Sequence, residues 1–370
     1  MKRHARFRRN GETGRIYRIE DPAGTPVVSG YVDLDALGFA TRPGSGDPHP
    51  ADGASAQAWE EDNASWDWVG KMSFGDIDVS EDGSTLWAVN LFDRHLYSIP
   101  VQSTPVGAGD IDRFDIVPQI TIGGSAPACP ATGDVRPFGL AVHDGLVYVG
   151  VTCTAESTVP GSHAGGNVAS AVGNAARMRG IVLRFDPSDS SWSEELNFPL
   201  DFARGNAIDL GTAVAARWNS WVPVFTPLGG VRGTRNEVVY PKPMLTDIEF
   251  HDGNMIIGMR DRFGDQTGYI QRPPTTIVDA TYNANGTGCT LAPYCVTGDA
   301  VGDMVKACGN PIDGWSFENN ASCGANTTAG AGNSQGPGGG EFFFQDQYMS
   351  LFTTKSSSAV WPRFRTGRRS

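Results

Sequence analysis

A unit of strand, Asp-Gly turn and second strand recurs three times in this 370-residue chain. The first copy covers residues 75–101, the second covers 138–153 and continues at 179–192, and the third covers 245–270. Alternating apolar and polar residues flank each Asp-Gly pair, which is the pattern of a β-hairpin. Asp and Gly tolerate the positive φ angles of a tight turn. A further segment, residues 13–24, matches only the later strand of the unit.

A hairpin that recurs with a polar loop and a third strand behind it is typical of the blades of a β-propeller. The 47 Gly and 24 Pro residues also favour short strands joined by turns. A β-sandwich contains hairpins too, but it does not explain why one order of strands recurs. We therefore predict an all-β fold, a β-propeller of the six- or seven-bladed type with long loops.

The charge and hydropathy of the chain exclude two classes of partner. The formal net charge of -12 argues against a nucleic-acid partner. No apolar run approaches the roughly 20 residues that a membrane span requires. We expect neither nucleic-acid binding nor a membrane span in this chain.

Six cysteines are scattered through the sequence, none of them in a Cys-x-x-Cys pair. An even, scattered set favours disulfides and an oxidising compartment. The pairs that close short loops are Cys129 with Cys153, Cys289 with Cys295 and Cys308 with Cys323. Other connectivities remain open. The basic N-terminus has no apolar stretch behind it, so we expect a signal peptide to be encoded upstream of it.

Pairs of acidic residues begin two copies of the unit: Asp76 and Asp78 in the first, and Asp247 and Glu249 in the third. Residues two apart on a strand share a face, and the innermost strand of a blade lines the central channel. Carboxylates that converge there from different blades would suit calcium. The alternative is structural, with one acid of each pair capping a turn or binding the backbone of the next blade.

A second pattern is an Asp-Arg pair after the second strand of the unit. Its members are Asp93 with Arg94 and Asp261 with Arg262, and Asp265 follows closely. We favour local ion pairs and contacts between blades over ligand binding for these residues. Arg136, beside the same inner edge, is the best-placed cation for a sugar carboxylate or sulfate.

Histidines offer little support for catalysis. His143 and His251 both precede an Asp-Gly turn. Matching positions in two copies indicate a feature of the repeat and not a catalytic pair. No glycine-rich loop carries the Lys and Ser/Thr of a phosphate site, so no nucleotide site is expected.

Several long motifs carry a resemblance to a known family. They include VGKMSFGDIDVSEDGSTLWAVNLFDRHLYSIPV, GDVRPFGLAVHDGLVYVGVTCTAE and MLTDIEFHDGNMIIGMRDRFGDQTGY. The chain resembles, over residues 1–349, the propeller-like region of large bacterial surface proteins that carry SdrD B-like or similar adhesin-type repeat domains. The resemblance implies an exported, cell-surface protein without established catalytic residues. It also supports the pairing of Cys129 with Cys153 and of Cys308 with Cys323.

The same resemblance predicts that both ends of the propeller are incomplete. The segment KRHA (2–5) resembles the inside of a first blade, and GGGEFFFQD (338–346) resembles a segment that leads into His-x-Glu and Gly-Gly-Leu-Ala stretches. A reading frame offset by two bases permits both stretches within residues 352–362. We therefore expect residues 1–349 to form one domain with a truncated first blade, and residues 350–370 to be an irregular, out-of-frame tail.

These observations predict a non-catalytic module of an extracellular or cell-surface protein. It would serve as a structural or adhesive platform for a glycan, protein or matrix ligand. The alternative is a calcium-dependent propeller hydrolase, similar to a lactonase, in which the channel carboxylates hold the metal. No cofactor other than calcium is expected.

Overall fold

The computed structural model describes residues 13–44, 67–160, 173–202, 218–223, 228–232, 235–239, 241–262, 265, 297–317 and 344–350. In these residues the fold is all-β, as predicted, with four sheets and only short 3-10 helices. The strands pair antiparallel except for one short parallel pairing, between β12 and β15. None of the described helices is long and apolar enough to cross a membrane.

The first two sheets come from the N-terminal part of the chain. β1 (Arg15–Glu20) pairs with β2 (Val27–Asp33) in a two-stranded sheet. The next sheet has the order β3 (Phe74–Val79), β4 (Thr85–Asn90), β5 (His95–Pro100) and β6 (Asp112–Asp115). β1 falls within residues 13–24, which were predicted to contain a later strand of the unit.

The third sheet repeats the four-stranded arrangement. It contains β7 (Val135–His143), β8 (Leu146–Cys153), β9 (Arg179–Asp186) and β10 (Ser191–Pro199), paired in that order. Short 3-10 helices lie in the connections of these two sheets. They are η2 (Ala108–Asp110), η3 (Val117–Gln119), η4 (Thr132–Asp134), η5 (Glu156–Thr158) and η7 (Ala175–Arg177).

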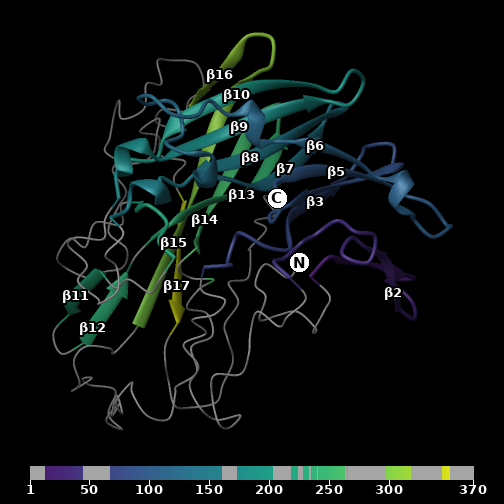
Figure 1. Cartoon of the computed structure of the whole chain (residues 1–370), viewed down its shortest axis with the longest axis horizontal. Helices are drawn as coiled ribbons and strands as arrows, with labels where there is room; N and C mark the ends of the chain where they lie inside the picture. Colours follow the sequence, from purple (N-terminus) through teal and green to yellow (C-terminus); the bar gives the residue numbers. More distant parts are fainter. Residues whose placement is uncertain are drawn as a thin grey trace, which may run out of the picture.

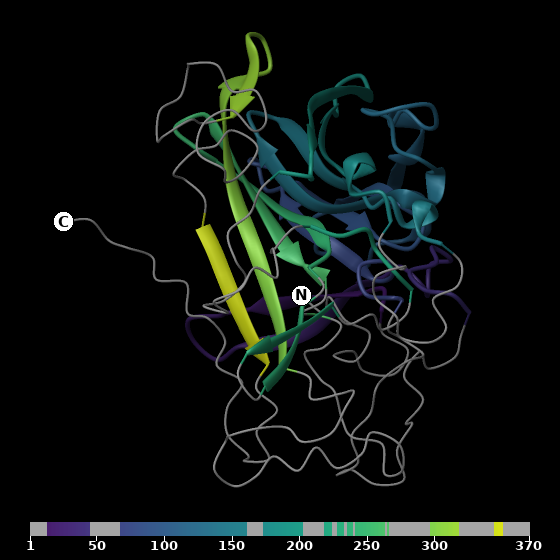
Figure 2. The same cartoon turned by 90° about the vertical axis from the view of Figure 1, so that its left-hand side faces the viewer.

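The fourth sheet has seven strands and departs from the expected unit. β13 (Pro243–His251) and β14 (Asn254–Asp261) form the predicted hairpin, and β14 pairs with β15 (Thr297–Asn310). The long β15 also pairs with β16 (Gly314–Phe317), β17 (Phe344–Ser350) and β12 (Arg235–Val239), and β12 pairs with β11 (Leu228–Arg232). Figure 2 shows β15 and β17 running side by side.

The Asp-Gly turns form as predicted in two of the three copies. In the second and third, Asp and Gly alone connect the strands, and both residues have positive φ: Asp144 52° and Gly145 73°, Asp252 50° and Gly253 74°. The first copy has a longer turn, in which only Gly83 has positive φ and the Asp82 carboxylate accepts hydrogen bonds from Ser80 and Ser84. Because this turn has more residues, its Asp does not need the positive φ that a two-residue turn requires.

The first strands of the three hairpins lie next to one another, β3 against β7 and β7 against β13 (Figure 1). Each carries a register shift near its start, between Phe74 and Ile77, between Pro137 and Leu140, and between Leu245 and Asp247. Two glycines allow the close approach. A Cβ on Gly75 would lie 2.5 Å from the carbonyl oxygen of Phe138, and one on Gly139 would lie 2.8 Å from the amide nitrogen of Asp247. We call β3, β7 and β13 the inner strands.

Apolar side chains join the sheets in series. One cluster includes Trp87 of β4 and Val149 of β8, a second includes Tyr148 of β8 and Ile257 of β14, and a third includes Ile16 of β1 and Ala88 of β4. Sheets stacked in order around adjacent inner strands are the arrangement of propeller blades. The described residues do not form a closed ring, so the number of blades stays a prediction.

The predicted disulfide between Cys129 and Cys153 is confirmed. Both cysteines are fully buried, and the bond ties the loop before β7 to the end of β8. Cys308 is also disulfide-bonded. Cys289, Cys295 and Cys323 lie outside the described residues, so the other two predicted pairings stay predictions.

Candidate functional site

The two ends of the inner strands have different chemistry. The register pairs the start of each inner strand with the end of the next strand, Phe74 with Asn90 and Val135 with Cys153. The loops that precede inner strands therefore lie beside the loops that follow second strands, and the Asp-Gly turns lie at the opposite end. Five charged residues from three sheets interact where those loops meet, and we call them the charged end: Asp67, Lys71, Arg136, Glu156 and Arg262.

Arg262, directly after β14, is the fully buried centre of the charged end. Its Nε donates to the carbonyl oxygen of Val69 at 2.9 Å, and its Nη1 donates to that of Val222 at 3.2 Å. Its Nη2 donates to the backbone and the carboxylate of Asp67, at 2.8 Å and 3.2 Å. The guanidinium also stacks over the ring of Trp221, 4.1 Å from the ring centroid. Arg262 therefore ties three loops together, which agrees with the structural role predicted for it.

Lys71 adds two ion pairs to this centre. Its Nζ lies 2.6 Å from Oδ1 of Asp67 and 2.8 Å from Oε2 of Glu156. Burial, followed by repulsion from Arg262, lowers the pKa of Lys71. Burial acts to raise the pKa of Asp67, but Arg262 and Lys71 outweigh it, so this pKa is lowered. Lys71 and Arg262 thus share the two carboxylates of the charged end.

Arg136, the second residue of β7, is the third cation of this group and is only half-buried. Its Nε is buried and has no hydrogen-bond partner. Burial is the largest cause that lowers the pKa of Arg136 to about 10, with Arg94 and Arg262 adding to it and Glu156 opposing it. Arg136 is therefore a cation without a direct anionic partner among the described residues.

In the first of the two Asp-Arg pairs, Asp93 and Arg94 each bind other partners and not one another. Asp93 accepts hydrogen bonds from the backbone N–H of His95 and from the hydroxyl of Tyr97, and it forms no ion pair with Arg94 among the described residues. Arg94 has a positive φ of 62°, and its Nη1 donates to the carbonyl oxygen of Thr132 at 2.6 Å. Both residues contact neighbouring backbone or side chains, in agreement with a structural role.

In the second pair, Asp261 and Arg262 also face different partners. Buried Asp261 accepts a hydrogen bond from the backbone N–H of Lys242 at 2.8 Å. Asp265 forms an ion pair with Arg260 and not with Arg262. Of the predicted ligand-binding residues, the structure thus brings Arg94, Arg136 and Arg262 into one electrostatic group.

The predicted calcium ligands lie along the inner strands. Asp78 of β3 accepts a hydrogen bond at 2.8 Å from the backbone N–H of Val142 in β7, which is the alternative role considered for these acids. Burial first, and then repulsion from Asp247 and Asp78, raises the pKa of Glu249, so carboxylates from two sheets are close neighbours. Among the described residues, Asp76, Asp78, Asp247 and Glu249 do not form a group of three with ligand atoms within 4.8 Å. Calcium binding stays a prediction.

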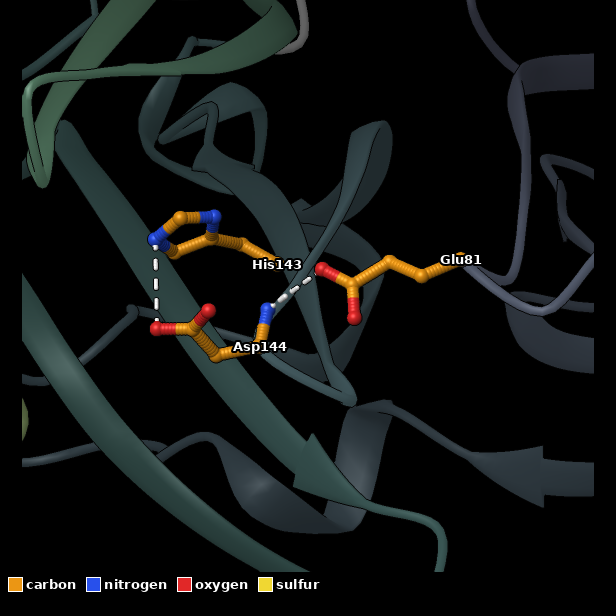
Figure 3. Close-up of side chains that lie close together, drawn as sticks. All are labelled: Glu81, His143 and Asp144. Atoms are coloured by element: carbon orange, nitrogen blue, oxygen red, sulfur yellow. Dashed lines mark hydrogen bonds and ion pairs between the residues drawn. The ribbon is translucent and has the colours of Figure 1, made fainter.

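At the opposite end, one cluster of three residues has ligand atoms that all lie within 4.8 Å of one another. Its members are Glu81, His143 and Asp144 (Figure 3). The backbone N–H of Asp144 donates to Oε1 of Glu81 at 2.8 Å, and Nε2 of His143 lies 3.6 Å from the carboxylate of Asp144. The ring of His143 stacks on Phe250 with centroids 4.1 Å apart. The cluster joins the turns of two sheets, which agrees with His143 being a feature of the repeat.

The sequence reasoning missed Lys71 and Lys242, although the repeat contains a signal for both. Only five lysines occur in the chain, and Lys71, Arg136 and Lys242 all stand at the entrance to an inner strand. Lys242 is fully buried, and burial lowers its pKa well below the usual value. Aligning the copies at their inner strands places Lys71 and Lys242 at the same position, which Asp134 occupies in the second copy.

No family model matches the chain. It is similar to colossins of Dictyostelium discoideum, among them Colossin-B, Colossin-A and Colossin-C. Colossin-B is 27% identical over 302 residues, which are 79% of this chain and 7% of that protein. Colossin-A is 24% identical over 208 residues, 55% of this chain and 2% of that protein. Colossin-C is 23% identical over 212 residues, 56% of this chain and 17% of that protein. The chain therefore spans a small part of the curated relatives that it matches.

These similarities correct the predicted family. The expected membership among bacterial surface proteins with SdrD B-like domains is wrong, because the relatives found are colossins of a eukaryote. The motifs that suggested a bacterial family are those of the repeating hairpin. Such a hairpin is imposed by the strand and turn pattern, which unrelated proteins can share.

Proposed function

We propose that this chain is a non-catalytic, propeller-type module of a much longer extracellular or cell-surface protein, where it provides a structural or adhesive platform for a ligand. The observation that carries the proposal is the adjacency of the inner strands β3, β7 and β13, with loops from three sheets meeting at one end of them. In propellers this is where ligands bind, because rigid sheets position variable loops there. A complete module would have six or seven such blades.

Two observations support the location and the modular character. The buried disulfide between Cys129 and Cys153 suits an oxidising compartment. The matched segments are 7% of Colossin-B and 2% of Colossin-A, so a segment of this kind is a small part of those proteins. By analogy, the present chain acts as one module among others.

A binding experiment with a parallel assay of hydrolysis tests the proposal. The 370-residue chain, purified under oxidising conditions, is applied to arrays of glycans and matrix proteins, and the same preparation is incubated with ester and lactone substrates with and without calcium. We expect saturable binding without turnover. Hydrolysis that requires calcium, together with an absence of binding, would refute the adhesive role.

The second candidate is the calcium-dependent propeller hydrolase. It is favoured by one observation, the proximity of Asp78, Asp247 and Glu249 from two inner strands. A metal there would bind these oxygen ligands and polarise a substrate carbonyl. Asp247→Asn would then abolish turnover, whereas Glu81→Gln, at the far turn, would leave it unchanged. A loss of turnover confined to Asp247→Asn would establish this candidate over the binding platform.

A further inference from the structure

We propose that the charged end binds an acidic glycan through a carboxylate or sulfate group, with the guanidinium of Arg136 as its anchor and Arg94 as a second contact. The inference rests on the proposed function, a binding platform, and specifies its ligand. It follows from a comparison of three cations at the same end of the inner strands and from the arrangement of the charges around them.

One cation stands at the entrance to each inner strand: Lys71 before β3, Arg136 in β7 and Lys242 before β13. Lys71 and Lys242 are buried, 7% and 0% exposed, and Lys71 is paired with two carboxylates. Arg136 differs, because it is half-buried and no described carboxylate lies within ion-pair distance of it. Lys71 is thus bound within the fold, whereas Arg136, at the same end of the inner strands, is open to an external partner.

The charges at this end explain why an anion would be attracted. Lys71 and Arg262 contact Asp67 and Glu156, so two cations are balanced by two carboxylates. Lys242 and Asp261 add one further charge of each sign. Arg136 is a cation in excess of these pairs, and Arg94 adds a further positive charge near it. The buried Nε–H of Arg136 has no acceptor, which costs free energy, so the protein itself leaves the hydrogen-bonding capacity of this guanidinium incompletely used.

The surroundings of Arg136 are held in place by direct contacts. Arg94 donates to the carbonyl oxygen of Thr132 in η4, the helix that ends directly before β7. Buried Asp134 accepts hydrogen bonds from the backbone N–H of Ser157 at 2.8 Å and from its hydroxyl at 2.6 Å. These bonds tie the loop before β7 to the loop after β8. The anchor is therefore preorganised, which reduces the entropy lost on binding.

The chemistry of arginine selects the class of ligand. A guanidinium presents parallel N–H donors that match two oxygens of one carboxylate or sulfate. Neutral sugars would leave the charge of Arg136 unbalanced. Uronate and sulfated glycans both present such groups repeatedly, so the experiment includes each of them separately.

The test measures binding of the full chain to polygalacturonate, heparin and neutral dextran at constant ionic strength, and to inorganic sulfate. Arg136→Gln is compared with Arg136→Lys, which keeps the charge but loses the paired donors. Arg18→Gln, an exposed arginine of β1, controls for net charge. We expect Arg136→Gln to weaken binding of an acidic glycan at least tenfold, Arg136→Lys to weaken it less, and Arg18→Gln to leave it unchanged within about twofold.

Thermal melting separates this effect from a loss of folding. If Arg136→Gln does not fold, Arg136→Lys carries the test alone, with a loss of at least threefold expected. Equal affinities in the Arg136 and Arg18 variants, or binding by the wild-type chain of inorganic sulfate alone, would overturn the inference. Binding of dextran or matrix protein without any acidic glycan would overturn it too, and the proposed platform function would survive. Absence of all binding would refute both.

Discussion

The carboxylate of Asp78 in β3 accepts a hydrogen bond at 2.8 Å from the backbone N–H of Val142 in β7. It therefore connects two sheets at the point where their inner strands lie together. The same side chain is near Glu249 and contributes to raising the pKa of that carboxyl, after burial and Asp247. Asp78 thus joins two sheets, and its negative charge also acts on a carboxyl group of a third sheet.

Replacing Asp78 separates these two effects. Asp78→Ala leaves the N–H of Val142 without its acceptor, and we expect a loss of about 1–3 kcal/mol in the free energy of unfolding. Asp78→Asn removes the negative charge and keeps one accepting oxygen in place of two, since Oδ2 accepts from Val142 and Oδ1 from Val79. We therefore expect a smaller loss than in Asp78→Ala. Urea denaturation at pH 7 measures both. If calcium raised the stability of the wild type but not of Asp78→Asn, this acid would be a metal ligand after all.

Adding one methyl group to Gly139 tests the close approach of β7 and β13. A Cβ there would lie 2.8 Å from the backbone nitrogen of Asp247, which cannot move without displacing β13. We expect Gly139→Ala to lower the free energy of unfolding by about 1–3 kcal/mol, as overpacking does. Gly133→Ala is the control, because nothing lies within 4 Å of its Cβ position. Equal stability of the two variants would contradict the contact.

Arg262 should matter far more for stability than an ion pair nearer the surface. Arg262→Gln leaves Asp67 and Lys71 in a buried site with altered charge and removes the stacking on Trp221. We expect a loss of about 3–5 kcal/mol in the free energy of unfolding. Arg18, whose Nη2 lies 2.7 Å from Oε1 of Glu20, provides the exposed comparison, because these two side chains are 43% and 55% exposed. For Arg18→Gln we expect at most about 1 kcal/mol, and chemical denaturation compares the two.

The stability of the fold should depend on pH through His95. Its Nε2 lies 2.6 Å from Oδ1 of Asp115, and its Nδ1 lies 3.5 Å from Oδ1 of Asp93. Hydrogen bonding with Asp93 is the largest cause that raises the pKa of His95 above its ordinary value of 6.5, against the opposing effect of burial. The protonated ring therefore stabilises the folded state.

The sign of the dependence follows from the raised pKa. The contribution is fully present below pH 6.5, the unfolded value, and is lost as the pH rises through the higher pKa of the folded state. Melting temperatures are measured between pH 5.5 and 8.5, a range that extends about a unit or more on each side of the unfolded pKa of His95. They should fall with pH more steeply for the wild type than for His95→Gln. Parallel curves for the two proteins would rule out this role of His95.

Local signals in the sequence predicted the all-β class and the tight turns of two hairpins, whereas the closed propeller stays a prediction. Asp144-Gly145 and Asp252-Gly253 form the expected two-residue turns because the positive φ angles are set by those residues themselves. The extra strands on β15 could not be predicted in the same way. Their pairing joins segments far apart in the chain, and neighbours on the sheet decide it more than strand propensity does.

The candidate site was predicted in part. Arg136 and Arg262 were identified because they stand near strand ends in recognisable copies of the unit. Glu156 was not, because it lies in a loop without alternation and its role depends on a contact with Lys71, 85 residues earlier. Charges that meet only after folding leave no local pattern in a sequence.

The three connections from a second to a third strand differ greatly in length. They cover residues 91–94, 154–178 and 262–296, and all three leave their sheets at the charged end. Insertions there change no strand pairing, because the hairpins close at the opposite end. The loops at the charged end can therefore change in length and composition while the paired strands that carry them stay the same.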